Sequence, residues 1–121
     1  MNPLVYIASP LSGDVEQNLN FARQACRYAI SQGVIPFAPH LLYPQMLDDN
    51  DPAERQLGID MGNQMLELCQ ELWLCGDRVS PGMEGERKTA EGLGISVRQI
   101  STQDVLSVEY SPTDGMGMEM R

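Results

Sequence analysis

The chain has 121 residues, 42% of them hydrophobic and 21% charged, which predicts one globular domain with a single core rather than a disordered or fibrous protein. Acidic residues outnumber Lys and Arg by 17 to 8, and the formal charge is −9. The eight basic residues are scattered, so duplex nucleic acid is not expected as a partner, because phosphates are bound by clustered cations.

The first third of the chain predicts a strand, a helix and a second strand. Residues 4–9, LVYIAS, form a short unbroken apolar run that is typical of a strand covered on both faces. Apolar residues then recur at helical spacing over 14–32, and Gly33 suits the end of that helix. Residues 34–39, VIPFAP, predict another strand, which Pro36 should place near an edge of the sheet.

The middle of the chain predicts a loop followed by a helix and a strand. Residues 40–53, HLLYPQMLDDNDPA, are rich in Pro, Asp and Asn, which indicates a long loop. Pro52 suits the start of a helix that runs to about residue 69. Residues 71–76, ELWLCG, then predict a third strand.

The last predicted helix begins at Ser80, which suits an N-cap, and a fourth strand follows over 95–100. Short apolar strands that alternate with amphipathic helices indicate a parallel sheet with helices on both faces. We therefore expect a small three-layer α/β fold, Rossmann-like or flavodoxin-like, with four to five parallel strands. The expected domain covers residues 1–102, and 103–121 is expected to be a tail, either disordered or docked on a neighbouring subunit.

One carboxylate of the last predicted helix points toward its buried face. Met83, Ala90 and Leu93 fall within an arc of about 80° around the helix, and Glu86 lies inside the same arc. A buried ion pair, or a side chain that reaches solvent, would also explain Glu86.

Cysteine and histidine usage argues against a metal site and for a reducing compartment. Cys26, Cys69 and Cys75 sit among apolar residues and predict free thiols. With His40 as the single histidine and no close pair of ligands, neither a metal nor another cofactor is expected. No leader-like or membrane-spanning run is evident, so we expect a cytoplasmic protein without a membrane partner.

Candidate binding residues follow the predicted strands, because open parallel sheets bind ligands beyond the carboxyl ends of their strands. A helix N-terminus there offers free amides and a partial positive charge to an anion such as phosphate. The candidates in these loops are Ser9, Ser12, Gly13, His40, Ser80 and Gly82. Ordinary turns and backbone hydrogen bonds would also explain these loop residues, and core packing would explain Tyr6.

Two motifs carry a family resemblance that covers residues 4–100. YIASPLSG at 6–13 and SPGMEGERKTA at 80–90 resemble the nucleoside 2-deoxyribosyltransferase superfamily, which includes the deoxynucleoside 5′-monophosphate N-glycosidases. The resemblance implies that Glu86 is a nucleophile and that Tyr6 orients it.

The same resemblance implies further site residues. An Asp that handles the proton of the base is expected before the third strand, where Asp60 is the nearest candidate and Asn63 lies closer to the expected spacing. Met83 lies in the second motif and is expected to bind substrate, as is Ser80. Lys88 replaces the glycine of the family pattern E-x-G-x-A.

The resemblance implies cleavage or transfer at the N-glycosidic bond of a nucleoside or nucleoside 5′-monophosphate. Glu86 would stabilise or bond to the sugar carbon C1′, and we expect the helix N-terminus to keep it anionic. The alternatives are a non-catalytic nucleotide-binding module, which would sense or sequester its ligand, and hydrolysis of an NAD-like dinucleotide. Because relatives often close the pocket with a neighbouring subunit, a homodimer or larger oligomer is expected.

Overall fold

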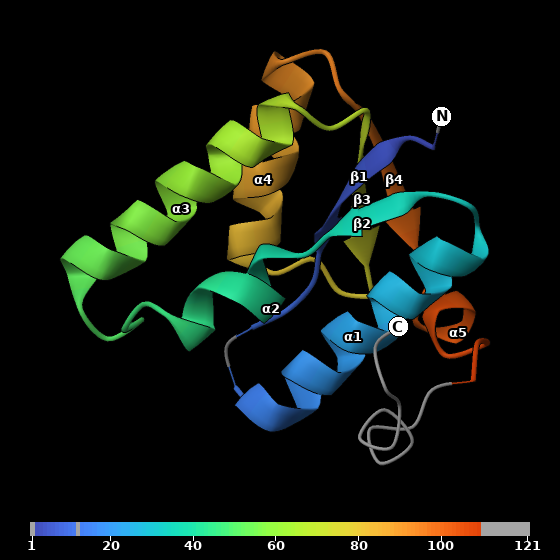
Figure 1. Cartoon of the computed structure of the whole chain (residues 1–121), viewed down its shortest axis with the longest axis horizontal. Helices are drawn as coiled ribbons and strands as arrows, with labels where there is room; N and C mark the ends of the chain where they lie inside the picture. The colour runs from blue at the N-terminus through green and yellow to red at the C-terminus, as the bar shows by residue number, and fades with distance from the viewer. Residues whose placement is uncertain (1, 12, 110–121) are drawn as a thin grey trace, which may run out of the picture.

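The computed structural model describes residues 2–11 and 13–109, which fold into a parallel sheet between two layers of helices (Figure 1). The elements are β1 (Leu4–Ala8), α1 (Val15–Ser31), β2 (Ile35–Phe37), α2 (Pro39–Leu42), the 3₁₀ turn η1 (Tyr43–Gln45), α3 (Pro52–Glu67), β3 (Glu71–Cys75), α4 (Pro81–Gly92), β4 (Ser96–Ile100) and α5 (Thr102–Val105). The four strands lie in the order β2-β1-β3-β4, the flavodoxin-like winding. The predicted α/β fold is confirmed.

One face of the sheet is covered by α1 and α5. Successive side chains of a strand point to opposite faces, and in β1 Val5 and Ile7 point to this one. They pack in a core with Ala25 of α1, Trp73 of β3 and Val105 of α5. Figure 1 shows these two helices together on the same side of the sheet.

The opposite face is covered by α3 and α4, which lie side by side in Figure 1. Tyr6 of β1 points to this face and packs in a second core with Leu66 of α3 and Leu72 of β3. Met83 and Ala90 anchor α4 in the same core, as their helical spacing predicts. This layer therefore holds both sequence motifs.

β2 lies at an edge of the sheet, where Pro36 was expected to place it. The strand pairs only with β1, through the parallel register Leu4 with Ile35, Val5 with Pro36 and Tyr6 with Phe37. Proline has no N–H to give to a second neighbour, so an edge position costs the sheet no hydrogen bond.

Two expectations about local structure need correction. The predicted loop over 40–53 contains the one-turn helix α2 and the turn η1, because Pro39 and Pro44 each suit the first turn of a short helix. Leu93 was expected to be buried but is 46% exposed. It is the C-cap of α4, where the helix ends and Gly94, at φ 74°, turns the chain toward β4.

The expected boundary after residue 102 falls inside α5, so the first residues of the expected tail belong to the folded core. Val105 of this helix is fully buried in the core beneath α1. The expected tail from residue 110 onward lies outside the described residues. Within the part of the chain that the structure describes, no helix is long and apolar enough to cross a membrane.

Candidate functional site

The site lies where the winding of the sheet reverses. β1 and β3 are parallel neighbours. β1 leads into α1 on one face, whereas β3 leads into α4 on the other. In this class of fold ligands usually bind beyond the carboxyl ends of the two strands at which the connections diverge.

Tyr6, in the middle of β1, and Glu86, in α4, meet on the face of the sheet that α3 and α4 cover. The hydroxyl of Tyr6 donates a hydrogen bond to Oε2 of Glu86 at 2.5 Å. Tyr6 is only 2% exposed, and Glu86 is partly buried on the face of α4 that also carries Met83 and Ala90. The structure thus brings together the two motifs that lie 80 residues apart in the chain.

Burial dominates the electrostatics of this pair. Loss of solvent raises the pKa of Glu86 from 4.5 to about 7, although the hydrogen bond from Tyr6 lowers it. Burial, followed by the neighbouring Glu86 carboxylate, raises the pKa of Tyr6 well above its usual range. The tyrosine is therefore always a donor, and near neutral pH the Glu86 carboxyl group is divided between its charged and neutral forms.

The helix N-terminus does not hold Glu86 anionic, contrary to our expectation. α4 begins at Pro81, which places Glu86 in its second turn. The field of a helix dipole acts mainly on groups within the first turn, so it does not offset the desolvation of this carboxylate.

The N-terminus of α4 is occupied by its own cap. Oγ of Ser80 accepts a hydrogen bond from the Met83 amide at 3.2 Å, and the Ser80 carbonyl accepts from the Glu84 amide at 2.9 Å. Gly82 is exposed beside this cap, whereas the Met83 side chain is 1% exposed and belongs to the core. Ser80 therefore fixes the start of the helix that carries Glu86.

A buried hydroxyl follows β1. Ser9 is 1% exposed, and its Oγ has no hydrogen-bond partner among the described residues. Burial lowers the pKa of His40, in α2, below its usual value, and the nearby backbone of Ser9 acts against that shift. Gly13 is exposed with φ 101°, and Ser12 lies outside the described residues. The ends of β1 and β2 thus meet through Ser9 and His40.

Asp60 is not brought to Glu86. It is exposed on α3 and accepts a hydrogen bond from Nε2 of Gln56 at 2.9 Å. The residue of α3 that faces Tyr6 is Gly62, and two residues along a helix correspond to a rotation of about 200°. Asp60 therefore lies on the opposite side of α3, while Asn63 is partly buried and about 100° from Gly62.

Gly62 is the site residue that sequence reasoning missed. A Cβ atom built on this glycine would lie 3.1 Å from the hydroxyl of Tyr6. The signal was present in the sequence, because an isolated glycine inside a helical pattern often marks a close contact.

Lys88 does not crowd the site. It is exposed, and it follows Glu86 by two residues, which turns it about 200° around α4. Lys88, which stands where the pattern E-x-G-x-A has glycine, therefore points away from Glu86.

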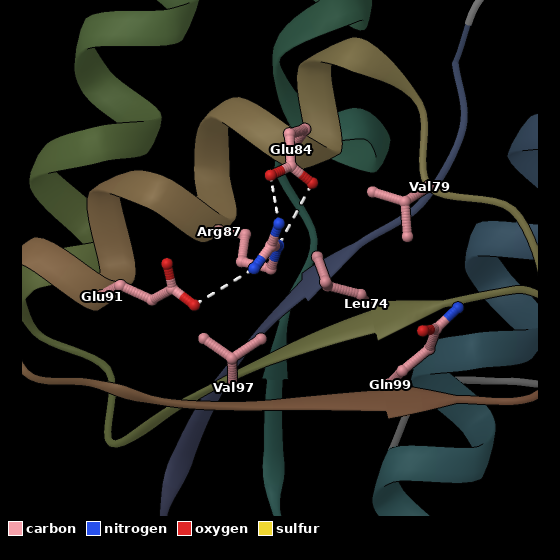
Figure 2. Close-up of a pocket in the computed structure, with 7 residues that line it drawn as sticks. All are labelled: Leu74, Val79, Glu84, Arg87, Glu91, Val97 and Gln99. Carbon is pink, nitrogen blue, oxygen red and sulfur yellow. Dashed lines mark hydrogen bonds and ion pairs between the residues drawn. The ribbon is translucent and has the colours of Figure 1, made fainter.

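Two hollows of the described surface lie away from Tyr6 and Glu86. Figure 2 shows a groove of about 400 Å³ between α4 and β4. Arg87 crosses it, with hydrogen bonds to Glu84 and, at 3.2 Å, to Glu91, so its charge is already paired. The groove is lined by Leu74, Val79, Glu84, Arg87, Glu91, Val97 and Gln99.

A second hollow of about 350 Å³ lies at the start of α3 and includes Asp49, Arg55 and Ile59. Neither hollow is lined by Tyr6 or Glu86. Within residues 2–11 and 13–109, no group of three His, Cys, Asp or Glu side chains could hold a metal ion.

Known structures share this fold. The chain resembles a 2-deoxyribosyltransferase from Bacillus psychrosaccharolyticus with a TM-score of 0.67 and 16% identity, over 96% of this chain and 92% of that one. It resembles a 2-deoxyribosyltransferase from Leishmania mexicana with a TM-score of 0.55 and 17% identity, over 98% of this chain and 74% of that one. At such identities the likeness establishes the fold.

Sequence comparison gives one curated relative and one family. The chain is 34% identical over 70 residues to the serine/threonine-protein kinase haspin of Bos taurus. The aligned stretch covers 57% of this chain but only 9% of that protein's length. Residues 3–100, nearly all of the described core, match a single family. The chain therefore belongs to the family described as domain of unknown function DUF7768.

Proposed function

We propose that this protein is an enzyme that cleaves or transfers at the N-glycosidic bond of a nucleoside or nucleoside 5′-monophosphate, with Glu86 as nucleophile. The observation that carries the proposal is the 2.5 Å hydrogen bond from Tyr6 of β1 to a partly buried Glu86 of α4. The shared fold with two 2-deoxyribosyltransferases supports the same class of reaction.

The proposed reaction has two steps. An oxygen of the Glu86 carboxylate bonds to C1′ of the sugar, while the electron pair of the C1′–N bond leaves with the base. Water or a second base then takes the sugar from Glu86 and restores the carboxylate. Tyr6 keeps one oxygen of Glu86 fixed, so that the other points toward C1′.

The leaving base needs a proton, for which the resemblance suggested Asp60. Because Asp60 lies across α3 from Tyr6, Asn63 is better placed to contact the base, and solvent water can supply the proton. Ser9 and His40 are proposed to contact the sugar or its 5′ group, since the Ser9 hydroxyl is buried and has no protein partner among the described residues.

The test is chromatography of bases released from a panel of nucleosides, their 5′-monophosphates and NAD. We expect free base from at least one nucleoside or monophosphate, and a loss of at least about 1,000-fold in Glu86→Ala, because the residue forms the covalent intermediate. Equal release by the Glu86→Ala variant would reject Glu86 as the nucleophile. Release from NAD alone would favour the dinucleotide reaction.

One observation favours a second function, a nucleotide-binding module without turnover. Burial raises the pKa of Glu86 to about 7, so below that pH the carboxyl group is mainly protonated, and in this form it could hydrogen-bond a nucleotide but could not attack C1′. A binding module would show a thermal shift with a nucleotide and return that nucleotide intact after prolonged incubation.

A neighbouring copy is proposed to close the site. Neither of the two hollows described above is lined by Tyr6 or Glu86, and we propose that a second copy completes the walls around this pair. Leu57 and Leu68, on or next to α3, are 48% and 65% exposed, and their separation of eleven residues places them on the same side of the helix, where they offer apolar side chains for such a contact.

A further inference from the structure

We propose that Gly62 is a positioning residue, because its missing side chain leaves the space on α3 in which the Tyr6 hydroxyl meets Glu86. The inference concerns the geometry of the Tyr6–Glu86 pair. Its consequence for catalysis rests on the proposed function, and the experiment below separates the two.

The contact is specific to one atom. A Cβ on Gly62 would lie 3.1 Å from Oη of Tyr6, and no other atom outside the helix backbone and the neighbouring residues comes within 4 Å. That separation is tighter than ordinary van der Waals contact, so the hydroxyl would have to give way by a few tenths of an ångström. The strength of a hydrogen bond falls steeply with such changes in length and angle.

The Tyr6 ring has little freedom to absorb this shift. Its strand, β1, is central in the sheet and is paired on both sides, with β2 and with β3. The ring packs edge-on against Phe37, with 5.7 Å between ring centroids, and Tyr6 is 2% exposed. Because Oη is fixed to the ring, the hydroxyl can move only if the ring tilts against these contacts or α3 moves away, and either change alters the contact between Tyr6 and Glu86.

Helix propensity alone does not explain a glycine at this position. Glycine in a helix interior is unfavourable relative to alanine, and α3 carries two, Gly58 and Gly62. A Cβ on Gly58 would meet the Leu47 side chain at 3.4 Å and Cβ of Tyr43 at 3.9 Å, both ordinary contacts. Gly58 thus provides a control in the same helix, without the tyrosine hydroxyl.

Few other groups act on the pair. Besides Glu86, the titratable side chains that bear on Tyr6 are Cys69, just after α3, and Tyr43 of η1. Burial raises the pKa of Cys69 to about 11, so this thiol is neutral under ordinary conditions. The titration of Glu86 therefore reports chiefly on its burial and on the Tyr6 hydrogen bond.

The experiment follows the carboxyl carbon of Glu86 by NMR during a pH titration, with the signal assigned through Glu86→Gln. The variants are Gly62→Ala, Gly58→Ala, Tyr6→Phe and the double variant Gly62→Ala with Tyr6→Phe. Because the Tyr6 hydrogen bond lowers the pKa of Glu86, we expect an upward shift in Gly62→Ala and in Tyr6→Phe. We expect no further shift in the double variant and none in Gly58→Ala.

Stability provides a second readout that does not need the Glu86 signal. If the added methyl group meets the hydroxyl, Gly62→Ala destabilises the unaltered chain but is neutral or stabilising in the Tyr6→Phe background. An equal effect in both backgrounds, or an unchanged Glu86 titration in a folded Gly62→Ala protein, would overturn the inference.

Activity then links the geometry to the proposed reaction. We expect Gly62→Ala to lower base release on the order of 10- to 100-fold, and Gly58→Ala to stay within about twofold. If the unaltered chain releases no base, the proposed function fails, while the titration and stability measurements still decide the role of Gly62.

Discussion

Two opposing effects set the pKa of Glu86. Burial raises its pKa to about 7, and the hydroxyl of Tyr6 acts against that rise by stabilising the carboxylate. A pKa near neutral pH is common among the carboxyl groups that act as catalytic acids, bases and nucleophiles. The same balance has consequences for stability and for the rate of the proposed reaction.

The first prediction concerns stability. Because the pKa of Glu86 is higher in the folded than in the unfolded chain, the folded state binds the proton more tightly. The free energy of unfolding should therefore decrease as pH rises from about 4.5 to about 7, by at most about 3 kcal/mol from this group. Glu86→Gln should remove that part of the pH dependence in urea unfolding at pH 4 and pH 8. If the free energy of unfolding changed by the same amount between pH 4 and pH 8 in the unaltered chain and in Glu86→Gln, the raised pKa would be contradicted.

The second prediction concerns the pH profile of base release. Attack on C1′ needs the carboxylate, so kcat/KM should rise with pH and level off above about 7, where Glu86 of the free enzyme is ionised. Initial rates between pH 5 and pH 9 measure this limb. A profile that is flat between pH 5 and pH 8 would exclude the titration of Glu86 as its cause.

The third prediction concerns Ser9. A buried hydroxyl without a partner loses its hydration and gains no bond, so Ser9→Ala should leave the free energy of unfolding unchanged or raise it by up to about 1 kcal/mol. If Ser9 binds substrate, the same variant should reduce the thermal shift caused by a nucleoside 5′-monophosphate. Ser31→Ala, at an exposed position of α1, is the control and should retain the full shift.

At the scale of elements, α4 carries the site. Ser80 caps its first turn and Pro81 begins it, while Met83 and Ala90 fix the helix against the sheet. These contacts determine which way Glu86 points. The position of the carboxylate therefore depends on where the helix begins as much as on its own hydrogen bond.

The fourth prediction tests that dependence. Ser80→Ala removes the acceptor of the Met83 amide and should lower the free energy of unfolding by about 1 kcal/mol, whereas Ser80→Asn restores an acceptor and most of the stability. Base release should follow the same order. If Ser80→Ala lowered base release and left the free energy of unfolding unchanged, Ser80 would instead contact the substrate directly.

The sequence predicted the elements well because their signals are local. Apolar runs marked β1 and β3, and the Ser-Pro pair marked the start of α4. The helical spacing of Glu86 with Met83 also predicted its inward direction. The prediction that Leu93 is buried was wrong because the spacing of apolar residues does not show where a helix ends.

The rest of the site depends on contacts between distant segments, which no local pattern records. Gly62 matters only because Tyr6, 56 residues earlier in the chain, ends beside it. The raised pKa of Glu86 depends on how deeply the folded chain buries it. Likewise, the closeness of His40 to the backbone of Ser9 requires the packing of α2 against the end of β1.

At the scale of the whole molecule, the winding of the sheet brings the two motifs together. β1 and β3 are neighbours although α1, β2 and α3 lie between them in the chain. The remaining question at this scale is what covers the pair, since neither of the two hollows described above is lined by Tyr6 or Glu86.

The fifth prediction is that the protein self-associates. Sedimentation at micromolar concentration should give at least twice the 13.4 kDa of one chain. Leu57→Lys or Leu68→Lys, which put a charge on the exposed apolar surface of α3, should weaken the association. A single-chain mass, with full activity, would mean that one copy forms the site alone.

The most direct test of the central claim is to find the sugar on Glu86. The protein would be quenched during turnover of a 2′-fluorinated nucleoside, which slows release of the covalent intermediate, and its peptides analysed by mass spectrometry. We predict that the peptide containing Glu86 gains the mass of the sugar, with fragmentation placing it on that residue, and that Glu86→Gln shows no adduct. A sugar adduct on another residue would contradict the account. So would base release without an adduct on any peptide, if the Glu86→Ala variant retained full activity.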